Sequence, residues 1–377
     1  MMKQWINKSF FLLIAGSLIC FSFTTFKKDF KRTIKKEFDL SKNGELEIDN
    51  KFGTVDIKTW NKNQVSIEVT IVVRADTKNE AEDIFDRISI HFSNDRNSVK
   101  AETEIASKKS SSWWGWNNYN NSNDYAINYD IYMPEAADLD LNNDHGETLL
   151  AKLKGDVAID IAHGELSAEG FEGELEIDFA HSNGTVGDVR SLKADIAHAD
   201  IRFGNVKEAE VDAAHADVEI DDISILRLDS RHADIELGEV DELRADTRHD
   251  DIEIESVGTL ISEAQHTSFK IDHLGKLLDL DCSHGGTSID HLAAGFQSVN
   301  LYGSHHTFRI QVDEDANFQL DASGSHAGIS VPSDLNIQYE KDKNSDREIK
   351  GFYGNANSKG ASMIKARLSH GGLRLRD

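Results

Sequence analysis

The sequence predicts an all-β protein: a single-chain parallel β-solenoid with coils of about 17–18 residues, preceded by a small β region with one helix. Three observations lead to this prediction. Histidines recur at near-constant spacing from residue 145 onward, apolar and polar residues alternate on both sides of them, and helical periodicity is confined to one short segment. Such short strands cannot bury an apolar face alone, so we expect the stacking of coils to create the core.

Residues 1–26 are predicted to be a signal peptide or an N-terminal anchor. Lys3 and Lys8 precede an apolar run from Phe10 to Phe23, which is the pattern of a secretory signal. The run is short for a membrane-spanning helix, which needs about 20 apolar residues. The chain is therefore expected to be exported to the periplasm or the cell surface, with membrane contact only if this segment stays uncleaved.

Residues 30–137 are predicted to form an N-terminal β region that contains one helix over residues 77–88. Thr77 is a good N-cap residue and Glu80 stands three positions later, so the two make a capping box. Apolar residues follow at helical spacing.

A loop over residues 110–124 is rich in tryptophan and asparagine. Trp113, Trp114, Trp116 and Tyr119 are candidate partner-binding residues, because exposed aromatic rings stack on sugars and on protein partners. The alternative is a loop that covers the open end of the solenoid.

Residues 138–334 are predicted to be the solenoid repeats, and residues 335–377 a C-terminal coil and cap. Eleven of the 16 histidines mark the repeats, with steps of 17, 18 or 21 residues. They are His145, His163, His181, His198, His215, His232, His249, His266, His284, His305 and His326. His370 is a candidate twelfth member, whereas His91, His273, His291 and His306 lie off the pattern.

The alternation predicts that each histidine lies at a corner and faces inward. Leu243, Ala245, Thr247 and His249 share one face of a strand by parity. Stacked coils should then place the rings in one column, a ladder of identical side chains. We interpret this ladder as structural, with imidazoles that hydrogen-bond to corner backbone groups. The alternative is a metal-binding column, because histidine is the commonest metal ligand.

Carboxylates form a second column, three residues before the histidines. Its members are candidate cation-binding residues: Asp160, Asp178, Asp195, Asp212, Asp229 and Asp246. By parity they face outward. We interpret them as a solvated surface that protects strand edges, and the alternative is weak binding of Ca²⁺ or another cation.

Composition excludes several classes of function. The chain of 377 residues has 67 acidic and 41 basic residues and a net charge of -26, which disfavours nucleic-acid binding. Two cysteines cannot form a disulfide framework. No nucleophile with its base, phosphate loop or zinc triad is recognisable, so we expect no enzyme and no cofactor. A carbohydrate-acting solenoid enzyme remains the alternative, although the carboxylates run in uniform columns without a distinguished pair.

Several motifs are similar to those of a known family. They are Ile48-Asp-Asn50 through Gly53 with Val55-Asp-Ile57 and Trp60, then Ile131-Tyr-Met-Pro134, and the repeat motifs His163-Gly-Glu-Leu166, His198-Ala-Asp-Ile201 and Ser369-His-Gly-Gly-Leu373. Over about residues 34–377 the chain resembles the bacterial putative-adhesin family, an adhesin-like group of cell-envelope proteins of unknown function. The resemblance implies an adhesin-like cell-envelope protein and brings no catalytic residues. We expect an exported, non-enzymatic scaffold or binding module whose partner the sequence does not identify, with a glycan or an envelope protein as the two candidates. This chain differs from the family pattern because histidine recurs where serine is usual.

Overall fold

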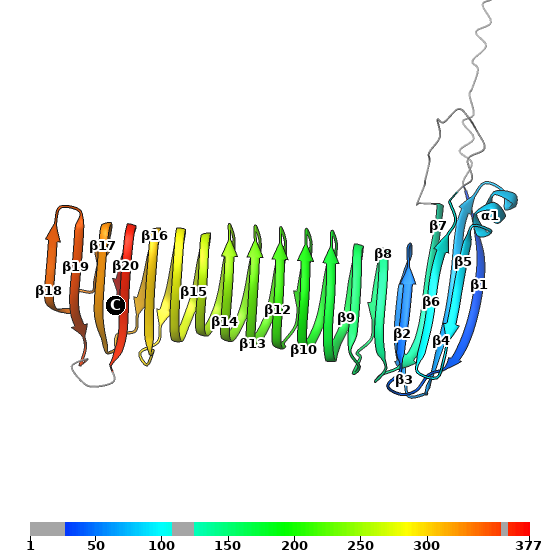
Figure 1. Ribbon diagram of the computed structural model, residues 1–377, viewed down its shortest axis with the longest axis horizontal. Coiled ribbons are helices and arrows are strands. Elements are labelled where there is room, and N and C mark those ends of the chain that lie inside the picture. Colours follow the sequence, from blue (N-terminus) through cyan, green and yellow to red (C-terminus); the bar gives the residue numbers. More distant parts are fainter. Residues whose placement is uncertain (1–26, 108–123, 356–360) are drawn as a thin grey trace, which may run out of the picture.

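The computed structural model describes residues 27–107, 124–355 and 361–377. This part of the chain contains twenty strands and one α-helix, which confirms the all-β prediction, and the strands form one continuous sheet. Figure 1 shows the strands side by side along the long axis of the molecule. No helix within the described ranges is long and apolar enough to span a membrane.

The N-terminal unit is mainly antiparallel. Strand β1 (Lys28–Asp39) pairs with β4 (Gln64–Ala75), and β4 pairs with β7 (Tyr125–Pro134). Strand β5 (Ile88–Asn94) pairs with β6 (Ser98–Ile105). Residues of β4 are buried in near alternation, and they belong to the same hydrophobic core as the buried residues of the repeats.

The single helix lies where the capping box predicts it. Helix α1 (Lys78–Phe85) begins after Thr77, whose side chain accepts a hydrogen bond from the backbone of Glu80. It ends at Phe85, three residues before the predicted end. The reason is that Ile88 already pairs with Ile105 in the β5–β6 hairpin.

Two short strands connect this unit to the repeats. Strand β2 (Glu45–Asn50) lies parallel to β6 and to β8 (Asp138–Leu150), and β3 (Val55–Trp60) lies parallel to β7 and β8. Together β2 and β3 add one more set of parallel strands before residue 138, where the repeats are predicted to begin.

The repeats form an array of strands that pair in parallel. Its strands after β8 are β9 (Val157–Ala180), β10 (Asn183–Ala197), β11 (Asp200–Phe203), β12 (Val206–Ala214), β13 (Asp217–Arg231), β14 (Asp234–Arg248), β15 (Asp251–Leu292) and β16 (Ser298–Val312). Between β12 and β15 each residue pairs with the residue 17 positions later, as Leu226 does with Leu243. One repeat therefore advances the chain by one strand spacing, and equivalent side chains of successive repeats lie next to each other.

The end of the array is not built in chain order. Strand β20 (Ser362–Arg376) lies parallel between β16 and β17 (Phe318–Ser330). Strand β19 (Asp346–Tyr353) pairs with β17, and β18 (Asn336–Lys343) forms the outer edge (Figure 1). Residues 335–377 thus provide both a terminal hairpin and a strand inside the stack.

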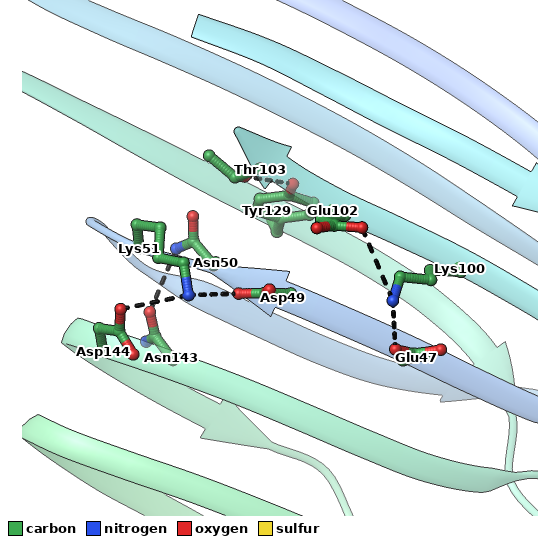
Figure 2. A network of polar contacts seen from close by, with 10 residues as sticks. All are labelled: Glu47, Asp49, Asn50, Lys51, Lys100, Glu102, Thr103, Tyr129, Asn143 and Asp144. Atoms are coloured by element: carbon green, nitrogen blue, oxygen red, sulfur yellow. Dashed lines mark hydrogen bonds and ion pairs between the residues drawn. The ribbon is translucent and has the colours of Figure 1, made fainter. Parts of the chain in front are cut away.

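A polar network lies where the N-terminal unit meets the array (Figure 2). The buried Asn50 donates a hydrogen bond to Asn143 at 3.2 Å, which joins β2 to β8. The ammonium group of Lys51 lies 2.9 Å from Asp49 and 3.3 Å from Asp144. These contacts tie together segments that are about ninety positions apart in sequence.

Tyr129 in this network makes the stability of the fold sensitive to alkaline pH. Burial raises the pKa of Tyr129 from 10.0 to about 12, and its hydrogen bond with Thr103 lowers it only in part. Well below pH 10 the phenol is neutral in both states, so the folded state keeps its full stability. As the pH rises from 10 toward 12, only the unfolded chain loses the proton, which favours unfolding by about 2–3 kcal/mol.

We therefore expect Tyr129→Phe to be less stable than the wild type at pH 8, by about 1 kcal/mol for the lost hydrogen bond. Near pH 12 this difference should vanish or reverse. Urea unfolding of both proteins across this range measures it, with Tyr132→Phe, an exposed tyrosine of the same strand, as the control. Parallel pH profiles for wild type and Tyr129→Phe would contradict the interpretation.

Candidate functional site: an exposed histidine ladder

The histidine rings stack in one continuous column. Neighbouring centroids are 4.5–5.1 Å apart, and the ring planes from His163 to His305 lie within 14° of each other. The spatial order is His145, His163, His181, His198, His215, His232, His249, His266, His284, His305, His370 and His326. The structure thus brings together the eleven predicted histidines and His370, which lies between His305 and His326 because β20 lies between β16 and β17.

The ladder faces solvent, so the prediction of an inward-facing column is wrong. All twelve side chains are exposed. Ten of these residues have φ between 50° and 63°, the left-handed conformation. A left-handed residue turns the chain and interrupts the two-residue alternation of a strand, so parity does not extend across it. The next residue takes the inward position instead, as Ala199, Ala216 and Ala233 do.

We expected the histidines to satisfy corner backbone groups, but in some repeats the next residue does so. Ser182 accepts a hydrogen bond from the amide of Gly164 at 2.9 Å and donates one to the carbonyl of Ala180 at 2.7 Å. The buried Asp250 accepts hydrogen bonds from the amides of Ala233 and Arg248 at 2.8 and 2.7 Å and from the hydroxyl of Ser230 at 2.9 Å. Burial raises the pKa of Asp250. The buried carboxylate therefore connects two neighbouring repeats, the one that contains Ser230 and Ala233 and the one that contains Arg248.

His306 occupies the same inward position after His305. It is fully buried and bonded to the hydroxyl of Thr287 at 2.9 Å, and burial lowers its pKa to about 4. The spacing places His306 off the pattern, and the structure accordingly gives it a different environment from the ladder. His273 and His291 form a separate stacked pair at 4.9 Å.

An aromatic residue precedes the first histidine of the ladder. The ring of Phe52 stacks on His145 at 5.0 Å, and Tyr125 packs edge-on against Phe52. Sequence reasoning missed this, although a signal exists. Asn50-Lys-Phe52-Gly53 matches Asn143-Asp-His145-Gly146, and the strand register aligns the two segments.

The predicted aspartates form a column on the outer surface. Asp195 pairs in register with Asp178 and Asp212, and Asp229 continues the series to Asp246. The Asp160 carboxyl belongs to it as well: burial, and next the charge of Asp178, raise its pKa. Within the described ranges, no three His, Cys, Asp or Glu side chains converge on one point in a way that could hold a metal ion.

A second carboxylate column runs two residues after the ladder. Asp200, Asp217, Asp234 and Asp251 pair in register along β11, β13, β14 and β15. With Arg202 and other polar side chains, the first three of these aspartates line an open groove of about 480 Å³. The ladder therefore has a strongly acidic strip beside it.

Two predicted features lie outside the described residues. They are the segment 1–26 and the candidate partner-binding residues Trp113, Trp114, Trp116 and Tyr119.

Comparison with known proteins gives structural similarity only. No protein-family model matches the chain, and no curated protein matches it. A putative adhesin from Parabacteroides distasonis ATCC 8503 aligns with 12% identity over 66% of this chain and 97% of its own, with a TM-score of 0.38. Putative adhesins from Parabacteroides merdae ATCC 43184 and Bacteroides fragilis NCTC 9343 align with 8% and 11% identity over 66% and 68% of this chain and 95% and 96% of their own, with TM-scores of 0.36 and 0.28. At these levels the similarity carries no inference about activity.

His215 has a positive φ. We therefore expect an unusual ranking of the stabilities of variants at this position. Glycine adopts positive φ without strain, whereas a β-branched residue is strongly disfavoured there. We expect His215→Gly to lose only the stacking on two neighbouring rings, and His215→Ile to be a further 1–2 kcal/mol or so less stable. Urea unfolding of the two variants measures the difference.

The matched control is Asp212, an exposed strand residue three positions before His215. There the order should reverse, because isoleucine favours a strand and glycine weakens it. The same order at both positions would show that the corner conformation does not govern stability at His215.

Proposed function

We propose that this protein is an exported, non-enzymatic cell-envelope protein, an adhesin-like scaffold or binding module, and that its array of parallel strands is a β-solenoid. The constant register of 17 residues per strand spacing supports the solenoid. A solenoid presents a long, stiff surface whose width stays the same along its length.

The repetition of the exposed surface carries the functional proposal. The same side chain is presented twelve times at intervals of 4.5–5.1 Å, with carboxylate columns beside it. A catalytic centre requires at least one residue whose surroundings differ from those of the equivalent residues in the other repeats. Equivalent groups in a row instead suit an extended partner that is contacted at many points, where weak contacts add up through multivalency.

The N-terminal segment supports export, and the net charge argues against one class of partner. A net charge of -26 opposes binding to nucleic acid. The basic start and short apolar run of residues 1–26 support export. The partner class that we favour is an envelope glycan or an envelope protein, with the aromatic residues 113–119 as the contact that stacks on it.

Export is tested by fractionation of cells that produce the full chain or a variant without residues 2–26. We expect the full chain in the envelope fraction or at the cell surface, and the shortened chain in the cytoplasm. A cytoplasmic enzyme of the same host serves as the fractionation control. Equal cytoplasmic accumulation of both forms would contradict export.

Binding is tested on arrays of envelope glycans and immobilised envelope proteins. We expect the chain to bind without altering its partner, and the triple variant W113A/W114A/W116A to bind about tenfold more weakly through loss of aromatic stacking. Trp60→Phe, outside this segment, is the control and should bind like the wild type. Cleavage of an arrayed polysaccharide would contradict a non-enzymatic role.

A further inference from the structure

We propose that the histidine ladder binds divalent transition-metal ions, Cu²⁺ and Zn²⁺ above all, with each ion held between two neighbouring rings. This activity goes beyond the proposed scaffold function. It follows from the exposure of the ladder, because ions reach every ring from solvent.

The ring nitrogens are free to act as ligands along most of the ladder. Among the contacts of the described residues, the side chains from His181 to His284 in ladder order take part in no hydrogen bond and no ion pair with protein groups. Only the last three rings, those of His305, His370 and His326, have a serine hydroxyl near Nδ1, at 3.2–3.3 Å. An imidazole with an unpartnered nitrogen is a good ligand for these metals.

The spacing suits a pair of rings once both rings rotate out of the stack. Between His198 and His266 the centroids are 4.7–4.9 Å apart and the planes lie within 7° of parallel, so equivalent nitrogens are separated by about the same distance. Two Zn–N bonds at a tetrahedral angle need nitrogens about 3.4 Å apart. Each nitrogen would have to move by about 0.7 Å, and both rings would have to rotate in opposite senses about the second side-chain torsion, because the nitrogen lone pair lies in the ring plane and must point at the ion. That torsion is soft in histidine.

The same spacing limits each site to two protein ligands from the ladder. A third ring lies a further strand spacing away, consistent with the lack of three converging ligands in the described ranges. Water would complete the coordination shell. Twelve rings give at most six such pairs, so the capacity of the ladder is up to six ions. The separate stacked pair of His273 and His291 has the same spacing and would hold one more.

The surroundings favour cations over other ligands. The column of Asp200, Asp217, Asp234 and Asp251 runs two residues from the ladder and adds negative potential along it. Imidazole selects Cu²⁺, Zn²⁺ and Ni²⁺, whereas Ca²⁺ and Mg²⁺ require oxygen ligands. The ladder and not the carboxylates should therefore decide which ions bind.

Two variants with equal numbers of histidines test the need for adjacent rings. Asparagine replaces histidine because it tolerates positive φ. The alternate variant replaces every second ring of the ladder: His163, His198, His232, His266, His305 and His326. The block variant replaces the first six rings: His145, His163, His181, His198, His215 and His232. Six ladder rings remain in each, without neighbours in the first and as three adjacent pairs in the second.

Untagged full-length protein is titrated with CuCl₂ and with ZnCl₂ by calorimetry, after circular dichroism has established that each variant is folded. We expect the ladder to take up to about six ions in the wild type and about three of wild-type affinity in the block variant, and to bind at least tenfold more weakly in the alternate variant. The pair of His273 and His291 is unchanged and should add the same contribution in all three proteins. Equal binding by the two variants, or no binding by the wild type, would overturn the proposal. Equal binding would assign the ions to single rings or carboxylates.

A measurement on the wild type keeps the proposal testable if a variant does not fold. Electron paramagnetic resonance of the Cu²⁺-loaded chain reports how many nitrogens coordinate the metal. Two nitrogens per ion are expected, and a signal from one nitrogen or from oxygen ligands alone would exclude sites between neighbouring rings.

Discussion

Parallel pairing in constant register is the constraint on which the rest of this structure depends. When residue i lies beside residue i+17, a side chain that recurs in every repeat forms a continuous column along the molecule. Apolar residues then form a continuous core, such as the column that joins Leu226, Leu243 and Leu260. The same register places like charges next to each other, and burial together with neighbouring carboxylates raises the pKa of Asp212. The acidic columns are thus a consequence of the architecture, with an electrostatic cost that the core must offset.

The left-handed conformation at each corner determines which side chains are exposed to solvent. A residue with positive φ directs the chain around the corner, and histidine is among the few non-glycine residues enriched there. The histidine ring is then exposed to solvent and stacks on the histidine ring of the preceding repeat. The inward position passes to the following residue, where Ser182, Asp250, Thr267 and His306 are buried polar side chains. An exposed ladder and a closed core therefore arise from the same local geometry.

Both ends of the array are closed by features that depart from the repeat. At the beginning, β2 and β3 continue the register, and Phe52 takes the place of a histidine. At the other end, β18 and β19 run antiparallel to their neighbours, and β20 lies within the stack. An open parallel array would leave unpaired backbone groups at each end. The N-terminal unit and the terminal hairpin cover them.

The sequence by itself determined the strand content, the repeat length, the helix after Thr77 and the set of histidines that belong together, because each of these leaves a periodic or local pattern. Only the tertiary structure decided the direction of the histidines, the place of β20 and the role of Phe52. The direction depends on one backbone torsion, and parity counting has no information about it. The place of β20 depends on which strand edges remain unpaired when the chain returns. Phe52 escaped notice because its neighbour in space, His145, lies 93 residues away and has a different side chain, so only the flanking Asn50 and Gly53 mark the equivalence in the sequence.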